Sequence, residues 1–157
     1  MITIIIGQAG CGKTTYVKNT FAIGNGIYNT IPIKHTLYGN NLLIGDYVSD
    51  KRCLGTDTLA YNVLPKIIEF IKDNCQKFNI VAEGDRINNK KFFEEISSFN
   101  VAAEVVVLTC SLEESIKRLR QNGSKITEKF VKATRTKTLN NKELCKKLNL
   151  KIIEKEV

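Results

Sequence analysis

Histidine is almost absent from this chain of 157 residues, since His35 is the only one. Catalytic triads that need a histidine, and metal sites built from several histidines, are therefore excluded. The five cysteines are odd in number, widely scattered and never spaced as CxxC. This pattern predicts free thiols in a reducing compartment and gives no support to a zinc site.

Long apolar runs and linker-like segments are also missing. No segment approaches the ~20 apolar residues of a membrane helix, and the apolar start "MITIII" lacks the basic flank and cleavage site of a signal peptide. There is no repeat, no low-complexity tract and no Pro- or Ser-rich linker. We therefore expect one domain over residues 1–157, no membrane, and a cytoplasmic location, in the host cytoplasm if the chain is virus-encoded.

The charge is unevenly distributed along an otherwise ordinary globular composition. The formal net charge is +8, with 43% hydrophobic and 25% charged residues. Residues 1–116 carry 11 Lys and Arg against 12 Asp and Glu, whereas residues 117–157 carry 13 against 4. Taken alone, the basic excess indicates solvated helix faces; beside a nucleotide site it would also suit a polyanion.

Short β-branched runs alternate with helical patterns, which predicts an α/β fold with a mainly parallel sheet. A turn at Gly39-Asn40-Asn41 is expected to make an antiparallel edge hairpin. Pro65 is expected to kink a helix over 57–77 or to start its second segment. Ser111 and Glu114 form a capping box, and a helical region from about 127 to 148 is expected to break near Asn140-Asn141. Strands are expected at 2–6, 41–47, 79–84, 103–109 and in "LKIIEK", and further helices at 12–21 and in "NKKFFEEISSF".

The segment "GQAGCGKT" matches the phosphate-loop pattern GxxxxGK[ST] at every defined position, directly after a strand and before a helix. Glycines let backbone amides converge on phosphate oxygens, and the helix N-terminus adds partial positive charge. Lys13 is expected to reach the β- and γ-phosphates and to be catalytic, and the Thr14 hydroxyl is expected to ligate Mg²⁺. The expected nucleotide-binding residues are Gly7, Gly10, Cys11, Gly12, Lys13, Thr14 and Thr15.

Acidic residues follow two of the expected strands, where side chains at carboxyl ends project into the ligand crevice. Glu83 ends "NIVAE" and is expected to accept from Mg²⁺-bound water; Asp85 is a second candidate for the metal. Asp46 follows "NLLIG" and is expected to act as the base that takes the proton of an attacking hydroxyl.

The acceptor of the phosphate would be bound beyond these acids. Candidate acceptor-binding residues are Tyr47, Asp57, Asp85 and Arg86, with Tyr61 nearby in the sequence. Gly55-Thr56-Asp57-Thr58 is equally well interpreted as a helix start with Asp57 as its cap. Asp85 and Arg86 are also ordinary residues for a surface loop.

Two arginines near a Gly-Ser break predict a lid over about 118–130. Phosphoryl transfer needs cations around the charge of the transferred group, and a closing lid excludes water. Arg118 and Arg120 are therefore candidate catalytic residues, although both also suit the C-terminus of a helix electrostatically.

Taken together, the phosphate loop, the acid after the second strand, "EGDR" and "RLR" resemble the nucleoside and nucleotide kinase group of P-loop proteins. The resemblance implies a single P-loop kinase domain with a mainly parallel five-stranded sheet of order 2-3-1-4-5, flanked by helices, with a short lid. It also implies ATP as phosphate donor, a carboxylate base and lid arginines. Neither the NKxD guanine motif nor a DEx[DH] helicase box is present.

More narrowly, "GDY…LGTD", the small size and the basic C-terminus resemble phage kinases that phosphorylate 5-hydroxymethyluracil in DNA. That resemblance implies Asp46 as base for a hydroxymethyl group and a basic region that grips the DNA backbone around a flipped base. One alternative is a kinase of free nucleosides or nucleoside monophosphates, although "GDRIN" stands where thymidylate kinases have DR[YH]. Another is a non-catalytic, ATP-dependent DNA-binding module.

Overall fold

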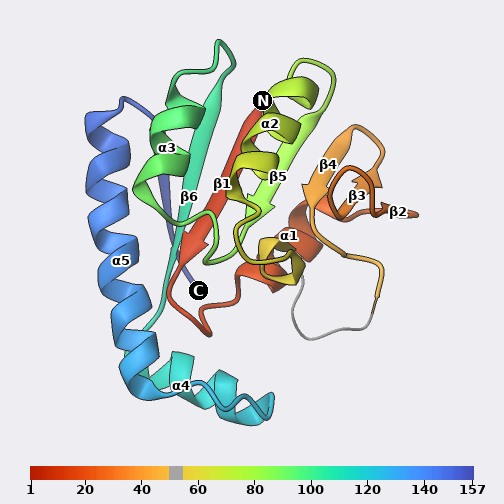
Figure 1. Ribbon diagram of the computed structural model, residues 1–157. Coiled ribbons are helices and arrows are strands. Elements are labelled where there is room, and N and C mark those ends of the chain that lie inside the picture. Colours follow the sequence, from red (N-terminus) through yellow and green to blue (C-terminus); the bar gives the residue numbers. More distant parts are fainter. Residues whose placement is uncertain (50–54) are drawn as a thin grey trace.

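A computed structural model describes residues 1–49 and 55–157 and has an α/β fold (Figure 1). Its described residues form one seven-stranded sheet in the order β2-β3-β4-β5-β1-β6-β7. The strands are β1 (Ile2–Gly7), β2 (Ile27–Asn29), β3 (His35–Tyr38), β4 (Asn41–Ile44), β5 (Asn79–Glu83), β6 (Ala103–Thr109) and β7 (Lys151–Glu156).

The sheet has a parallel part and an antiparallel extension. Strands β4, β5, β1, β6 and β7 are mutually parallel, whereas β2 and β3 join the β4 edge antiparallel. The expected hairpin is confirmed, since Tyr38 pairs with Asn41 and Gly39 turns with φ 57°. The expectation of five strands was too low for the described residues, because β2 is only three residues long and leaves little pattern in the sequence.

Helices cover both faces of the sheet (Figure 1). Residues of α2, α3 and α5 share one core cluster with Ile2, Ile4 and Ile6. Residues of α1 share the other with Ile5 on the opposite face. Because successive strand residues point to opposite faces, the apolar run of β1 serves both layers. The helical segments are α1 (Lys13–Phe21), the 3₁₀ turn η1 (Gly55–Thr58), α2 (Leu64–Asn74), α3 (Lys90–Ser97), α4 (Leu112–Gln121) and α5 (Glu128–Lys147).

The expected helix over 57–77 is divided into η1 and α2, and Pro65 lies in the first turn of α2. Proline suits that position, because its missing N–H has no partner within the helix there. The capping box at the start of α4 is confirmed in part: the Ser111 hydroxyl accepts from the Glu114 N–H at 3.0 Å.

The expected break near Asn140-Asn141 was wrong, because α5 runs unbroken through both residues. The Asn141 side chain is buried, and its Nδ2 donates to the backbone oxygen and to Oδ1 of Asn88, each at 2.9 Å. Asn88 in turn donates to the Thr138 hydroxyl at 3.0 Å. The asparagine thus satisfies its amide through a tertiary contact instead of ending the helix.

Among the described residues, four cysteines are free and buried: Cys11, Cys75, Cys110 and Cys145. Cys53 lies outside the described residues.

The carboxyl ends of β1, β4 and β5 lie at the same edge of the sheet, the lower one in Figure 1. The segments that follow them, residues 8–12, 45–49 and 84–89, are therefore neighbours, and the candidate residues are found there.

Candidate active site

The loop between β1 and α1 contains two glycines in the left-handed region. Gly10 has φ 79° and Gly12 has φ 91°, and Gly12 directly precedes α1. A Cβ at Gly10 would come 2.6 Å from the Ser115 carbonyl oxygen, so this position lacks room as well. Loops of this kind turn successive backbone N–H groups toward one point, and the helix N-terminus adds partial positive charge there. The left-handed glycines and the helix start are features shared with such loops, whereas the N–H groups of Ala9 and Cys11 donate within the protein here.

Side chains beneath the loop fix its position. Gln8 is buried, and its Nε2 donates to Ser115 Oγ at 2.6 Å and to the Cys110 carbonyl at 3.2 Å. The Ala9 N–H donates to Thr134 Oγ1 on α5 at 3.0 Å. Sequence reasoning missed Gln8 and Thr134, because Gln8 occupies a variable position of the motif and Thr134 lies 125 residues away from Ala9.

The remaining loop residues have different surroundings. Cys11 is buried, and burial is the main cause that raises the pKa of its thiol. A Cβ at Gly7 would come 2.5 Å from Cys11 Sγ, so the thiol packs beneath the loop. The Cys11 N–H donates to the Gln8 carbonyl oxygen at 3.3 Å. Thr15 lies exposed in the first turn of α1.

Lys13, the first residue of α1, folds back over the loop. Its Nζ donates to the carbonyl oxygens of Gly7 at 3.0 Å and Gln8 at 3.2 Å. Both acceptors are backbone oxygens at the end of β1 and the start of the loop. The ammonium is therefore held at the loop itself, where an anion would meet it.

Thr14, in the first turn of α1, and Glu83, at the end of β5, are in contact. Thr14 Oγ1 donates to Glu83 Oε1 at 2.7 Å, and Glu83, at the end of β5, is only 2% exposed. A hydroxyl that donates its proton to a carboxylate keeps its oxygen lone pairs for a cation. Magnesium in phosphotransfer sites takes one or two protein ligands beside substrate phosphates, so this pair fits such an ion.

Several groups compete to set the protonation of Glu83. Burial is the largest influence and raises the pKa of this carboxyl above its ordinary value. The positive charge of Lys13 and the hydrogen bonds from Thr14 and Tyr47 oppose that rise, and Asp57 adds to it. The donors and the Lys13 charge limit the rise, but burial prevails, so the pKa of Glu83 stays above its ordinary value.

Asp46 lies two residues beyond β4 and is 4% exposed. Its Oδ1 accepts from the backbone N–H groups of Val48 at 3.2 Å and Ser49 at 3.1 Å. This turn orients the carboxylate at the same sheet edge as Glu83. Partial burial and, second, the charge of Asp46 raise the pKa of Tyr28 on β2. Tyr28 is therefore a neighbour of Asp46 that sequence reasoning missed.

Tyr47, expected to bind the acceptor, has its side chain directed to the carboxylate of Glu83. It is 4% exposed, and its hydroxyl donates to Glu83 Oε1 at 3.3 Å. Burial first, and then the charge of Glu83, raise the pKa of this phenol well above its ordinary value, so it remains a hydrogen-bond donor. Its position beside the metal candidate contrasts with the acceptor-binding role expected for it.

The segment Gly55–Thr58 is packed against the ends of β4 and β5. Gly45, Gly55 and Gly84 all have positive φ, at 123°, 65° and 129°. A Cβ at Gly45 would overlap the Gly55 carbonyl, and one at Gly55 would come 2.5 Å from Glu83 Oε1. Thr56 Oγ1 donates to the Glu83 carbonyl oxygen at 2.8 Å. This turn therefore helps to bury Glu83.

The other expected acceptor residues form a cluster where the turn at 55–58 meets the segment after β5. Asp57 Oδ1 accepts from the Asp85 N–H at 3.1 Å. Arg86 donates to the carbonyls of Thr56 at 3.0 Å and Asp57 at 3.2 Å, and its guanidinium lies 4.6 Å from the ring centre of Tyr61. Tyr61 is 86% exposed. Asp85 itself forms an ion pair with Lys137 Nζ at 2.9 Å, whereas the carboxylate bonded to Thr14 is Glu83.

The two expected lid arginines differ in their contacts. Arg118 reaches the phosphate loop, where its NH1 donates to the Cys11 carbonyl at 3.5 Å while Glu114 holds its Nε at 2.9 Å. Arg120 instead donates to the carbonyls of Ser124 at 3.1 Å and Ile126 at 3.2 Å. It thereby fastens the connection between α4 and α5.

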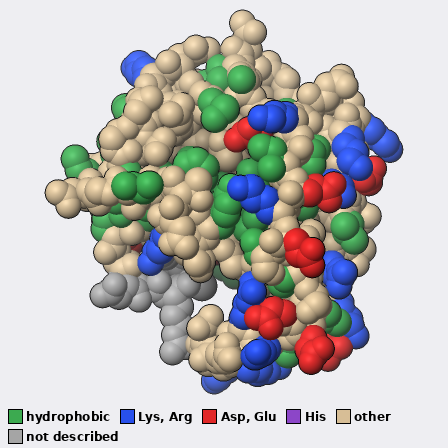
Figure 2. Space-filling model, turned by 180° about the vertical axis from the view of Figure 1, so that it is seen from behind, with side chains coloured by type: hydrophobic (Ala, Val, Ile, Leu, Met, Phe, Trp, Pro, Cys, Tyr) green, Lys and Arg blue, Asp and Glu red, His purple; other side chains and the backbone are tan. Residues whose placement is uncertain are grey.

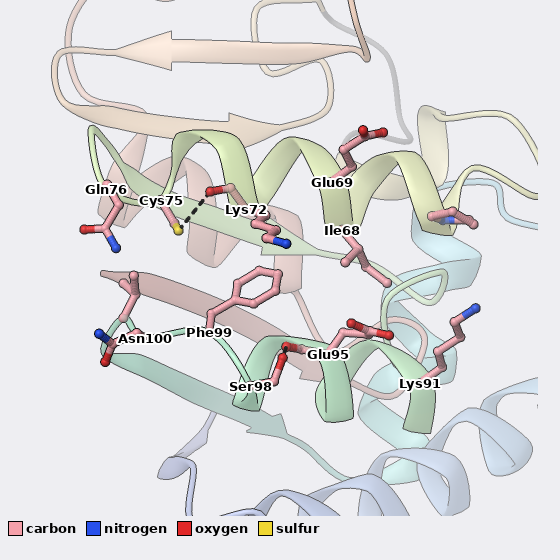
Figure 3. A pocket seen from close by; sticks show the side chains of 12 residues that line it. Ile68, Glu69, Lys72, Cys75, Gln76, Lys91, Glu95, Ser98, Phe99 and Asn100 are labelled. Atoms are coloured by element: carbon pink, nitrogen blue, oxygen red, sulfur yellow. Dashed lines mark hydrogen bonds between the residues drawn. The ribbon is translucent and has the colours of Figure 1, made fainter.

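A hollow of about 740 Å³ lies away from these residues, between α2 and α3 (Figure 3). Ile68, Cys75 and Phe99 contribute its apolar part, and the Phe99 side chain points into the space between the helices. None of the phosphate-loop residues lines it. The chemistry-bearing side chains are thus gathered at the sheet edge rather than in this hollow.

Within residues 1–49 and 55–157, no helix has the length and apolar character needed to cross a membrane. In the same part of the chain, no three or more His, Cys, Asp or Glu side chains are grouped so as to hold a metal ion. No model of a known protein family matches the sequence, and no curated protein matches it.

Proposed function

We propose that this protein is an ATP- and Mg²⁺-dependent phosphotransferase that transfers the γ-phosphate to a hydroxyl of a nucleotide or nucleic acid. The observation that carries the proposal is the 2.7 Å hydrogen bond between Thr14 and Glu83. It joins the hydroxyl expected to ligate the metal to a buried carboxylate, directly beside a glycine loop that leads into a helix N-terminus. This combination suits a magnesium-nucleotide better than a simple glycine turn.

The strand arrangement supports a kinase-like fold. Numbered among themselves, the parallel strands β1, β4, β5, β6 and β7 have the order 2-3-1-4-5 along the sheet. That order is the one implied by the resemblance to nucleoside and nucleotide kinases. The antiparallel pair β2–β3 is an addition at the β4 edge of the parallel strands.

The proposed transfer uses three side chains around the phosphates. Asp46 takes the proton of the acceptor hydroxyl, whose oxygen forms a bond to the γ-phosphorus as the bond to the ADP oxygen breaks. Lys13 and Arg118 stabilise the negative charge on the transferred group and on the leaving ADP. Bound Mg²⁺ would supply further charge neutralisation through Thr14 and a water held by Glu83.

The favoured acceptor is the hydroxymethyl group of 5-hydroxymethyluracil in DNA. Residues 117–137 carry eight Lys and Arg against one Glu, so the basic excess is concentrated at the corner between α4 and α5. This corner adjoins the phosphate loop, because Arg118 contacts Cys11 and Thr134 contacts Ala9. Such a density of positive charge exceeds what one nucleotide requires and suits a polyanion.

A free nucleoside or nucleoside monophosphate is the alternative acceptor, and the ion pairs of the C-terminal elements favour it. Lys132 pairs with Glu128, Lys142 with Glu154 and Lys146 with Glu143. Figure 2 shows Lys and Arg interleaved with Asp and Glu on the right-hand and lower parts of the surface seen from behind. Paired charges of this kind form an ordinary solvated surface.

The test is transfer of labelled γ-phosphate from ATP to hydroxymethyluracil-containing duplex DNA, plain DNA, free deoxynucleosides and their monophosphates. We expect label on the modified DNA, lost with Lys13→Ala and with Asp46→Asn but retained with Asp73→Asn, an exposed carboxylate of α2. Label only on a free nucleoside or nucleotide would show that the acceptor is that small molecule and not DNA. Absence of label on every acceptor, with DNA binding unchanged in Asp46→Asn, would favour a non-catalytic binding module.

A further inference from the structure

Tyr47 links the segment after β4, which carries the candidate base, to the end of β5, which carries the candidate metal-binding carboxylate. Its backbone belongs to the segment after β4, next to the candidate base Asp46. Its side chain is buried and extends to the carboxylate of Glu83 at the end of β5. A residue that lines an acceptor pocket would instead present its hydroxyl to the ligand.

The backbone of Tyr47 is held on both sides by β3. Its N–H donates to Thr36 Oγ1 at 3.1 Å, and its carbonyl accepts from the Tyr38 hydroxyl at 3.1 Å. Thr36 Oγ1 itself donates to the Gly45 carbonyl at 2.9 Å. All these groups are buried, so the antiparallel extension fixes where the Tyr47 ring begins.

The hydroxyl of Tyr47 reaches an oxygen that is already crowded. Glu83 Oε1 accepts from Thr14 at 2.7 Å as well as from Tyr47 at 3.3 Å. The backbone of Gly55 closes the third side, since a Cβ there would lie 2.5 Å from the same oxygen. The two hydrogen bonds to Oε1 and the close approach of the Gly55 backbone restrict the orientation of the carboxylate and hence the direction in which Oε2 can accept a hydrogen bond.

We propose that Tyr47 is a positioning residue for Glu83, through which the β3–β4 hairpin sets the geometry of the magnesium site. The inference rests on the proposed function, because it assigns Glu83 to the metal. Partners that orient metal-site carboxylates typically change metal affinity by 10–100-fold when removed. The 3.3 Å separation is long for an O–H···O hydrogen bond, so the lower end of that range is expected.

The test compares Tyr47→Phe, which keeps the ring, with Tyr16→Phe. Tyr16 lies on α1, packs its ring against Phe21 and is not part of the site. Calorimetry would measure ATP binding as a function of Mg²⁺ concentration and again in EDTA. Steady-state kinetics would give the Mg²⁺ concentration for half-maximal transfer and the KM of the acceptor.

Tyr47→Phe is expected to raise the half-saturating Mg²⁺ concentration about tenfold. ATP binding in EDTA, the acceptor KM and kcat at saturating Mg²⁺ should stay within about twofold of wild type, and in a Glu83→Gln background the substitution should add no further shift. A Mg²⁺ midpoint equal to that of Tyr16→Phe would overturn the inference, as would a change confined to the acceptor KM. If the affinity of the wild-type protein for ATP does not depend on Mg²⁺ concentration, the proposed function and this inference are both overturned.

Discussion

At the scale of single residues, Arg118 and Arg120 are neighbouring cations that make different contacts. Both were predicted from the same short stretch, because sequence spacing places each near the end of α4. Only Arg118 contacts the phosphate loop, whereas Arg120 is used by the carbonyls of Ser124 and Ile126. The two arginines are two positions apart within α4 and therefore lie on different faces of the helix. Which face meets the loop before α1 depends on how α4 packs, which the sequence does not show.

Arg118→Ala is therefore expected to lower kcat by roughly 10²–10³-fold, the usual cost of removing a donor that stabilises transition-state charge. Arg120→Ala should leave kcat within a few-fold and instead loosen the α4–α5 connection, seen as faster hydrogen exchange there. Single-turnover transfer rates of the two variants measure this difference. Equal loss in both variants would contradict the assignment of different tasks.

Glu83 gives the second prediction at this scale, a dependence of stability on pH. Burial raises the pKa of this carboxyl, so the folded protein binds its proton more tightly than the unfolded chain does. The free energy of unfolding then falls as pH rises through the interval between the two pKa values, by about 1.4 kcal/mol per unit of difference.

Glu83→Gln removes this titration and is expected to stabilise the nucleotide-free protein near pH 8, with the gain vanishing near pH 4. Urea unfolding over that range, with the exposed Glu69→Gln on α2 as control, measures it. If Glu83→Gln is the less stable protein near pH 8, the hydrogen bonds and the Lys13 charge outweigh burial, contrary to this account.

At the scale of elements, glycines decide how closely the segments after β4 and β5 approach. Gly45 has φ 123°, and a Cβ there would overlap the backbone of Gly55. Gly39, in the β3–β4 turn, also has positive φ, at 57°, but nothing lies within 4 Å of its Cβ position. Comparing substitutions at Gly45 and Gly39 therefore separates the free energy lost through overpacking from that lost through backbone strain.

Gly45→Ala is expected to destabilise the protein by about 3 kcal/mol or more, because strain and overpacking add. Gly39→Ala should cost only about 1 kcal/mol, the penalty for a left-handed L-residue. Thermal or urea unfolding of both variants gives the comparison. Equal losses would mean that the Gly45–Gly55 approach relaxes without cost.

The same elements show what the sequence could predict. The strand, glycine turn and helix start over residues 2–21 were predictable, since β1, the glycines and α1 are contiguous and each has a local physical reason. The hairpin at Gly39-Asn40 was predictable for the same reason. The unbroken α5 was not, because Asn141 is satisfied by Asn88, 53 residues away, and neither was the contact of Tyr47 with Glu83, 36 residues apart.

At the scale of the whole molecule, the position of the basic excess leads to a prediction about salt. Lys125, Lys129 and Arg135 are exposed at the α4–α5 corner. If this corner contacts DNA phosphates, changing the three to Gln should weaken DNA binding and lower the slope of log K against log salt by roughly one per charge removed. Lys66, Lys72 and Lys77, exposed on or just after α2, provide a matched triple substitution that should have no effect. Equal effects of the two triples would indicate non-specific attraction.

All of these inferences depend on one claim, that the loop from Gly7 to Thr15 binds a magnesium-nucleotide. The most direct measurement is calorimetric titration of ATP into wild-type protein and Lys13→Ala, each with Mg²⁺ and with EDTA, with the exposed α1 variant Lys18→Ala as control. We expect saturable binding at one site, strengthened by Mg²⁺ and intact in Lys18→Ala. In Lys13→Ala it should be weakened about 10–100-fold, as expected for hydrogen bonds between charged groups. Binding that is absent, or equal in wild type and Lys13→Ala, would contradict the claim.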